Sequence, residues 1–332
     1  MIYDELEKIL STESQSIIIG EDIENNNSYN PKEYGGAFKV TRDLSNKYPD
    51  QVKNTPISEQ AIAGFSIGYA LSGKVSILEI MFGDFTTLVF DQLLQHVSKF
   101  SLMYGEIIKI PFILRTPMGG FRGYGPTHSQ SLEKHFLGIP GLRVVVLNQL
   151  IEPSEIFNQI LNIKEPTLLI ENKVLYTKNI YENVVPGYAM FKSKTIDSFP
   201  VIRVLPENEN GTLTLICYGG ILDEVLKAIQ LLFVEDEILV ELFVVSEISQ
   251  SNIPGLLDSI NKTNKLCIIE EGNSFASFSS EVVSMLVEKK CKNFSLLRIS
   301  NNSIIPSSRE FELKVLPTAI KIKSQISIFV NE

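Results

Sequence analysis

The chain has 332 residues, of which 44% are apolar and 21% are charged, and its formal net charge is −9. This length predicts two domains, each long enough to bury a core, and the composition excludes a disordered chain. An acidic chain is a poor match for nucleic acid, because phosphate binding requires a basic face.

The cysteines and the N-terminal segment indicate the compartment. Cys217, Cys267 and Cys291 show no paired spacing, which disfavours a disulfide framework and fits a reducing setting. No stretch approaches the ~20 apolar residues of a membrane helix, and the acidic start MIYDELEKIL lacks the basic-then-apolar order of a secretory signal. We therefore expect a cytoplasmic protein that does not bind membranes.

The first half of the chain alternates short apolar runs with longer helical periods. Expected strands are residues 16–20, 75–80, 110–115, 142–147 and 167–170, and expected helices are residues 58–72, 86–104 and 153–163. Apolar strands separated by helices predict a parallel sheet that is covered on both faces. The polar run at residues 25–30 predicts an exposed loop.

Residues 172–210 interrupt this alternation, since prolines and glycines recur there with little periodicity. A second alternation follows, with expected strands at residues 213–218, 238–245, 266–270 and 294–299 and expected helices at residues 221–233, 253–261 and 277–288. The sequence thus predicts an α/β protein of two domains, residues 1–178 and 211–332, joined by a linker at residues 179–210.

The helix expected at residues 58–72 is rich in small residues, namely Ala61, Ala63, Gly64, Gly68 and Ala70. A glycine inside a helix costs about 1 kcal/mol relative to alanine, so close approach of another backbone should compensate. An intrachain helix contact and a subunit interface are equally open.

Histidine is scarce, and His128 follows the glycine-rich segment MGGFRGYG at residues 118–125. An imidazole on such a loop suits acid/base chemistry near neutral pH, and the alternative is a surface turn with an incidental histidine. His96 falls inside an expected helix and is interpreted as structural, and His135 ends a helical turn. The segment lacks GxxxxGK[ST], and no helix opens directly after it, which excludes ATP-binding and NAD-binding loops.

Glu59 and Phe85 allow two interpretations each. Ser58 is a candidate N-cap, so Glu59 would lie in the first helical turn, where the helix dipole favours a carboxylate. By itself this favours a structural role. Phe85 in MFGDFT is, by residue type alone, more often a core aromatic than a platform for a ligand.

Six ordered segments nevertheless resemble one known family, the β subunit of the E1 component of thiamin-diphosphate-dependent 2-oxo acid dehydrogenases (pyruvate, branched-chain and acetoin). In this family a transketolase-like pyrimidine-binding domain precedes a transketolase C-terminal-like domain. The segments are GED at 20–22, YGGAFKVT at 34–41, NTPISEQAIAGFSIGYAL at 54–71, EIMFGDF at 79–85, RTPMGGFRGYGPTHSQSLEKHFLGIPGL at 115–142 and EPTLLIENKVLY at 165–176.

The resemblance implies roles for particular residues. Glu59 matches the glutamate that hydrogen-bonds N1′ of the coenzyme's aminopyrimidine, where proton sharing favours the imino form that takes the proton from thiazolium C2. Phe85 matches the aromatic ring that stacks on the aminopyrimidine, with Ile57 and Met81 completing an apolar wall. His128 matches the active-site histidine, which handles protons during decarboxylation or acyl transfer.

The resemblance also implies partners. The family holds the diphosphate and Mg²⁺ through a GDG motif, whereas this chain has GDF at residues 83–85 and no GDG. We therefore expect no metal site in this chain, and an E1 α-like partner in an α₂β₂ heterotetramer that holds Mg²⁺. A potassium site is left open, because ILNIKEP at residues 160–166 lacks the usual aspartate.

The leading hypothesis is thus decarboxylation of a small 2-oxo acid, followed by acyl transfer to the lipoyl group of an acyltransferase core. Three alternatives remain. The chain could belong to an acyloin-forming enzyme, to a split transketolase-type enzyme or to a non-catalytic scaffold. Presence of Glu59, Phe85 and His128 together argues against the scaffold.

Overall fold

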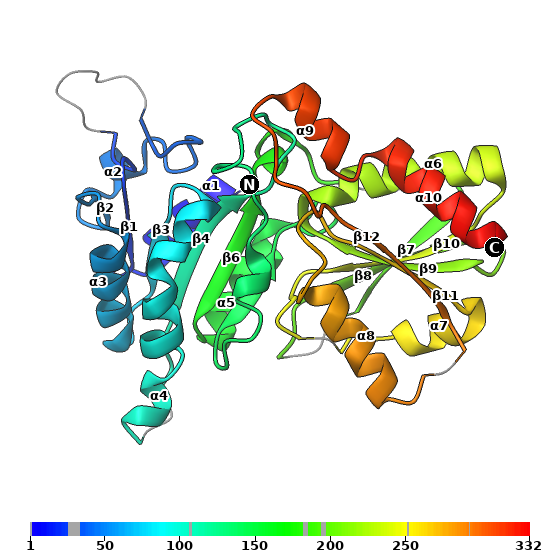
Figure 1. The fold of residues 1–332 in the computed structure, drawn as a ribbon. Helices are drawn as coiled ribbons and strands as arrows, with labels where there is room; N and C mark the ends of the chain where they lie inside the picture. The colour runs from blue at the N-terminus through cyan, green and yellow to red at the C-terminus, as the bar shows by residue number, and fades with distance from the viewer. Residues whose placement is uncertain are drawn as a thin grey trace. The chain divides into compact units, whose positions relative to one another are not determined.

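The computed structural model describes residues 2–25, 34–105, 108–181, 185–193, 197–250, 252–291 and 293–332, so most of the loop expected at residues 25–30 lies outside the described residues. The chain divides into two compact units (Figure 1). The first comprises residues 1–118, 138–145 and 152–171, and the second comprises residues 119–137, 146–151 and 172–332.

The first sheet has six strands in the order β2-β1-β3-β4-β6-β5 within the described part of the chain. The pairs β1–β2, β1–β3 and β3–β4 are parallel, and β3, β4 and β6 are buried along their whole length, as expected for a sheet covered on both faces. The strands are β1 (Ile17–Gly20), β2 (Val52–Asn54), β3 (Ser76–Glu79), β4 (Phe112–Met118), β5 (Arg143–Val146) and β6 (Thr167–Asn172).

The α-helices of this unit include α1 (Ile2–Thr12), α2 (Leu44–Lys47), α3 (Glu59–Leu71) and α5 (Pro153–Ile163) (Figure 1). The bounds of α5 agree with the prediction because Pro153 starts the helix without losing a hydrogen bond and an apolar stripe continues to Ile163. Helix α1 packs against α5, and α3 packs against β3.

The prediction of one long helix at residues 86–104 is wrong. The segment forms a 3₁₀ helix η1 (Gly83–Val89), a π-helix η2 (Gln92–Val97) and a short α4 (Phe100–Met103). Hydroxyl groups compete with regular helical bonding here: Thr87 donates to the carbonyl of Asp84 (2.9 Å) and Ser98 to that of Leu94 (2.9 Å).

The second sheet has six strands in the order β12-β11-β9-β10-β8-β7 within the described residues. Strands β9 to β12 pair in parallel, whereas β8 pairs antiparallel with both β10 and β7. The strands are β7 (Tyr188–Ser193), β8 (Val201–Pro206), β9 (Leu213–Tyr218), β10 (Val240–Val245), β11 (Lys265–Ile269) and β12 (Ser295–Ile299).

Strands β7 and β8 lie in the segment that was expected to be an irregular connection. The sequence pattern of β7 was weak because β7 is an edge strand. With Phe191 and Lys192 exposed, it shows neither a continuous apolar run nor a clean alternation of apolar and polar residues. The expectation of α/β architecture in two parts, with mostly parallel sheets, is confirmed.

The helices of the second unit are α6 (Leu222–Asp236), α7 (Leu256–Thr263), α8 (Phe278–Glu288), α9 (Arg309–Val315) and α10 (Ala319–Asn331). Helix α10 packs along α6 (Figure 1), where Lys323 donates to Asp236 (2.8 Å). Ser277 and Ser280 form a reciprocal capping box that starts α8. Among the described residues, no helix is long and apolar enough to cross a bilayer.

Candidate functional site

Glu59 is the first residue of α3, as predicted, and its side chain is partly exposed. Ser58 occupies the N-cap position, but its side chain makes no capping hydrogen bond. The helix start therefore leaves the Glu59 carboxyl in the field of the first-turn amides without a neighbouring side chain competing for them.

Glu21 lies near Glu59 and was not assigned a role by the sequence. It directly follows β1, so it stands at the carboxyl end of a parallel strand, where ligand sites of α/β proteins gather. Burial raises the pKa of Glu21, and the charges of Glu59 and Asp22 raise it further. One carboxyl oxygen, Oε1, is buried and has no hydrogen-bond partner among the described residues. The GED segment carried the signal, but spacing alone did not show that it meets α3.

Phe85 belongs to a cluster of three aromatic rings. Its ring meets that of Phe82 edge to face at 6.2 Å, and Phe82 meets Phe38 edge to face at 5.6 Å. The Phe85 ring is partly exposed rather than a core side chain, and η1, which carries it, packs against α3. Met81 is also partly exposed, whereas Ile57 is 84% exposed.

A buried ion cluster supports the same edge of the first sheet. Arg115, only 1% exposed, donates from Nε and Nη2 to the two carboxyl oxygens of Glu171 (2.8 and 2.6 Å) and from Nη1 to Glu79. Burial raises the pKa of Glu79, against the opposing effect of Arg115. Gly36 is required beside this cluster, because a Cβ there would lie 2.6 Å from Glu79 Oε1.

His128 belongs to the second unit, so the structure describes it separately from Glu59 and Phe85. Its Nδ1 lies 3.0 Å from Thr127 Oγ1, and its backbone carbonyl accepts a hydrogen bond from Lys173 Nζ (2.8 Å). Lys173 is fully buried, which makes this contact a fixed support for the loop rather than a surface encounter.

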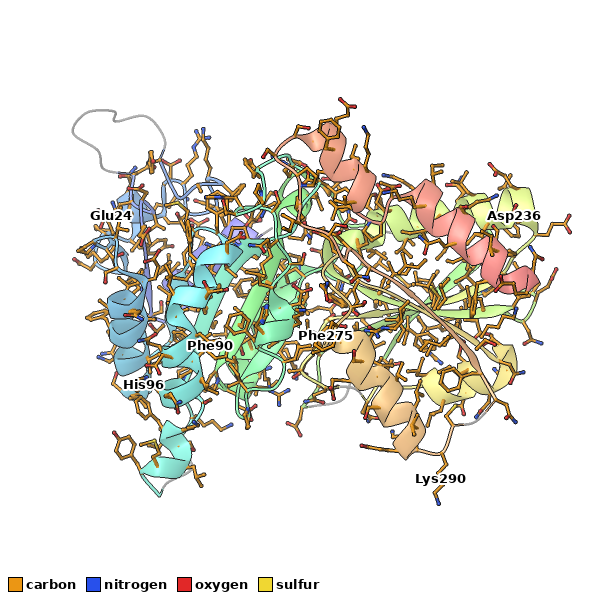
Figure 2. All side chains as sticks on the ribbon, viewed as in Figure 1. Glu24, Phe90, His96, Asp236, Phe275 and Lys290 are labelled. Atoms are coloured by element: carbon orange, nitrogen blue, oxygen red, sulfur yellow. The ribbon has the colours of Figure 1, made fainter. Side chains whose placement is uncertain are left out.

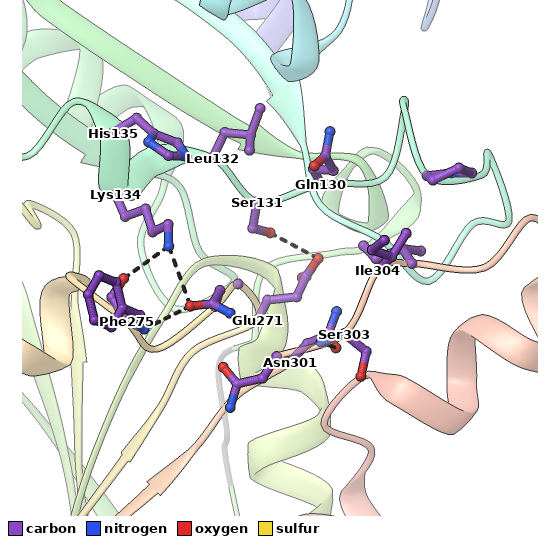
Figure 3. Close-up of a pocket in the computed structure, with 15 residues that line it drawn as sticks. Gln130, Ser131, Leu132, Lys134, His135, Glu271, Phe275, Asn301, Ser303 and Ile304 are labelled. Atoms are coloured by element: carbon purple, nitrogen blue, oxygen red, sulfur yellow. Dashed lines mark hydrogen bonds between the residues drawn. The ribbon is translucent and has the colours of Figure 1, made fainter.

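A cavity of about 530 Å³ adjoins the segment after His128 (Figure 3). Ser131 and Lys134 line it from that segment, and Glu271 lines it from the turn after β11. Lys134 Nζ donates to the carbonyl of Phe275 (2.9 Å), and Ser131 Oγ donates to Glu271 (3.1 Å). His135 also lines the cavity, and burial, aided by the charge of Lys134, lowers its pKa.

His96 has a different setting. It lies on η2 in the first unit (Figure 2), its side chain is 44% exposed, and its ring packs 5.6 Å from that of Phe100. No group of three or more His, Cys, Asp or Glu side chains able to hold a metal ion occurs in the described part of the chain.

Comparison with known proteins gives two family matches. Residues 1–178 match the family "Transketolase, pyrimidine binding domain", and residues 203–322 match "Transketolase, C-terminal domain". A solved structure described as "Split gene transketolase, inactive beta4 tetramer" superposes with a TM-score of 0.72 over 100% of this chain and 98% of that one, at 16% identity. This likeness concerns the fold.

Similar curated proteins carry related names. The mitochondrial 2-oxoisovalerate dehydrogenase subunit beta of Dictyostelium discoideum is 28% identical over 85% of this chain and 72% of its own length. The pyruvate dehydrogenase E1 component subunit beta is 27% identical in Rickettsia conorii, over 86% of this chain and 82% of that protein. In Mesostigma viride it is 28% identical, over 95% and 92%. The chain belongs to the transketolase family of pyrimidine-binding and C-terminal domains, and within it resembles the E1 β subunits of 2-oxo acid dehydrogenases.

Proposed function

We propose that the chain is the β-type subunit of a thiamin-diphosphate-dependent 2-oxo acid dehydrogenase and that it binds the aminopyrimidine half of the coenzyme. The observation that carries the proposal is the carboxyl pair of Glu21 and Glu59 at the carboxyl end of the first sheet. The named relatives support the class of reaction.

The residues present fit an aminopyrimidine. The partly exposed carboxyl of Glu59 offers an acceptor or a shared proton to a ring nitrogen, and the buried, unpartnered Oε1 of Glu21 offers a second polar atom beside it. Phe85 adds a partly exposed ring on η1, the element that packs against α3. An aromatic ring and two carboxyl groups carried by neighbouring elements are the kinds of group that bind a flat, basic heterocycle.

Each residue then has a definable task. When bound, the coenzyme supplies the electron sink that makes loss of CO₂ from a 2-oxo acid feasible. Glu59 would hold a proton at N1′ of the bound coenzyme, Phe85 would stack on its ring and exclude water, and Ile57 and Met81 would extend the apolar wall. His128 moves a proton when the acyl group leaves for its acceptor, and Lys173 fixes the backbone at that histidine.

The chain is proposed to work with an α-type subunit in an α₂β₂ assembly. Helix α3 exposes Ala61, Gly64, Phe65 and Gly68 along one face, at helical spacing. A Cβ added at Gly64 or Gly68 would meet no atom of the described residues within 4 Å, so no close intrachain backbone contact explains these glycines in that part of the chain. An intersubunit contact is the remaining explanation.

The partner is proposed to hold Mg²⁺ and the diphosphate, since the GDF segment ends in Phe85 where a GDG motif would place glycine. The proposed acyl acceptor is the lipoyl group of an acyltransferase core, and the proposed setting is cytoplasmic. The proposal leaves the potassium site open, because ILNIKEP at residues 160–166 lacks the usual aspartate.

The direct test mixes the purified chain with a candidate α-type subunit, thiamin diphosphate, Mg²⁺ and a series of small 2-oxo acids. Release of CO₂ coupled to an artificial electron acceptor is the expected result. Product analysis identifies the alternatives: acyloins or ketoses point to a carboligase, and absence of turnover with every 2-oxo acid contradicts the proposal.

The matched variants are Glu59→Ala and Glu281→Ala. Both residues lie in the first turn of a helix, α3 and α8 respectively, so both changes remove the same favourable dipole contact. Only the first is expected to abolish CO₂ release. Full activity of Glu59→Ala would show that the assigned role is wrong.

A further inference from the structure

We propose that two buried carboxyl groups, those of Glu271 and Glu312, form a carboxylate clamp that fixes the glycine-rich loop carrying His128. The inference rests on the proposed function, because it makes Glu271 and Glu312 positioning residues for that histidine. All groups involved belong to the second unit.

Glu271 supplies the first half of the carboxylate clamp. It follows β11, its exposed fraction is 5%, and its Oε1 accepts hydrogen bonds from the backbone N–H of Gly120 and from Ser131 Oγ (3.1 Å, Figure 3). Its Oε2 accepts from Asn172 Nδ2 (3.0 Å). One carboxyl group therefore joins a residue before His128 to a residue after it.

Glu312 supplies the second half. It lies on α9 with no exposed surface, and its Oε2 accepts a hydrogen bond from the backbone N–H of Gly123 (2.9 Å). Because the Glu312 side chain is buried, loss of this contact would leave the Gly123 N–H without its carboxyl acceptor. Three contacts, at Gly120, Gly123 and Ser131, thus bracket His128 on both sides.

The glycines explain how the carboxyl groups come so close. A Cβ at Gly119 would clash first with the Asn172 side chain and would lie 2.9 Å from Glu271 Oε1, and a Cβ at Gly120 would lie 2.8 Å from Leu316 Cδ1 and 2.9 Å from Glu312 Oε1. Gly119 and Gly123 also adopt φ of +89° and +75°, which other residues rarely tolerate. Side chains at Gly119 and Gly120 would therefore displace the Glu271 and Glu312 carboxyl groups together with their neighbours Asn172 and Leu316.

The Lys173 contact completes the arrangement at His128 itself. Lys173 Nζ donates to the carbonyl of His128, and its positive charge partly offsets the burial that raises the pKa of Glu271. The loop is thus held through its backbone at Gly120, Gly123 and His128, which leaves the imidazole ring to do chemistry while the main chain stays fixed.

The test measures amide hydrogen exchange of Gly120 and Gly123 in the full chain, because these N–H groups bond directly to the carboxylate clamp. Glu271→Ala is expected to raise exchange at Gly120, and Glu312→Ala at Gly123, each by about tenfold or more. Glu310→Ala is the control, since Glu310 lies on the same helix but is exposed. Unchanged exchange in both clamp variants overturns the proposal.

Two milder variants cover the case in which a buried alanine prevents folding. Ser131→Ala removes one bond of Glu271 and leaves Gly120 bonded, whereas Glu271→Gln keeps one acceptor oxygen for Gly120 and gives up the acceptor that faces Asn172. Exchange at Gly120 should rise in Ser131→Ala by less than in Glu271→Ala and should be largely restored in Glu271→Gln. An equal loss of protection in Glu271→Gln and Glu271→Ala contradicts the clamp.

Kinetics of the assembled enzyme distinguish a failure of the carboxylate clamp from a failure of the proposed function. With wild-type activity established, Glu312→Ala is expected to lower kcat about tenfold while KM for the 2-oxo acid changes little, because the loop positions the acid/base group and not the coenzyme. If wild type shows no turnover but exchange responds as above, the loop is clamped and the function assignment fails. If wild type turns over and exchange does not respond, the clamp fails.

Discussion

Glu21 and Glu59 lie close enough in the first unit for their charges to interact, and the charge of Glu59 adds to burial in raising the pKa of Glu21. Glu21 directly follows a parallel strand and Glu59 begins a helix, so the sheet edge brings together two carboxyl groups that are far apart in sequence. Paired acids in a partly buried position indicate a site that binds a proton or a basic group.

The pair predicts a measurable coupling. Because the folded-state pKa of Glu21 is raised above its ordinary value of 4.5, the stability linked to it is fully present below about that pH and is lost as pH rises through the folded pKa. Glu21→Gln should therefore reduce the loss of stability between acidic and neutral pH. Urea unfolding over a pH series measures it, and a double-variant cycle with Glu59→Gln should give non-additive effects. Strict additivity would show that the two charges do not interact.

Phe85 predicts a change in coenzyme affinity. Phe85→Leu removes the aromatic face but keeps an apolar side chain, so the α/β mixture should bind thiamin diphosphate about tenfold more weakly, as expected for loss of one stacking contact. Phe85→Tyr keeps the ring and should bind as wild type does. Calorimetric titration of the mixture measures both, and equal affinity of the leucine and tyrosine variants would exclude stacking.

Arg115 predicts a large effect on stability. Its guanidinium is the shared partner of Glu79 and Glu171, all three being buried. Arg115→Met leaves two carboxyl groups without it and should lower the free energy of unfolding by about 3–5 kcal/mol. Arg115→Lys should rescue little, since an ammonium cannot make the two parallel bonds to Glu171. Chemical denaturation measures these free energies of unfolding. A decrease below about 1 kcal/mol for Arg115→Met would contradict the role of Arg115 as the shared partner of the two buried carboxyl groups.

Glu133 predicts a second pH effect, in the second unit. Tyr218 Oη lies 2.8 Å from Glu133 Oε1 and 3.1 Å from Glu270 Oε2. Burial raises the pKa of Glu133 to about 7, and the charges of Glu271 and Glu270 act in the same direction. Neutral Glu133 is thus favoured in the folded chain below about pH 7.

The consequence is a loss of stability as pH rises from about 4.5 to about 7, of about 3 kcal/mol for this group. Glu133→Gln keeps the neutral shape and should flatten that part of the profile of unfolding free energy against pH. A profile that is unchanged in Glu133→Gln would show that Glu133 does not titrate in this range.

Local patterns predicted the regular elements well. Strand β9 has the expected bounds because its apolar run is bounded by Gly211 and Gly219, and α5 follows from Pro153 and a clear helical stripe. The broken helix after Gly83 was missed because threonine and serine hydroxyl groups bond back to carbonyl groups, an effect that apolar spacing does not report.

Tertiary contacts explain what the sequence did not reveal at the site. The predicted position of Glu59 in the first turn of α3 is confirmed. Its neighbour Glu21 was not predicted, because it follows a strand almost forty residues earlier in the sequence. From the sequence, the glycine-rich loop was considered only as a ligand-binding loop or a surface turn. In the structure, its glycines lie against Glu271 and Glu312, which come from much later in the chain. Such contacts depend on the packing of distant segments, which no local period encodes.

The central claim is that Glu59 binds the aminopyrimidine of thiamin diphosphate and that an α-type subunit completes the site. Calorimetric titration of thiamin diphosphate with Mg²⁺ into the chain alone, into the α/β mixture and into a mixture carrying Glu59→Gln tests it most directly. We predict binding by the wild-type mixture, none by the chain alone, and at least about tenfold weaker binding by the variant mixture at unchanged assembly. Equal affinity of the variant mixture, or full binding and turnover by the chain alone, would contradict the account.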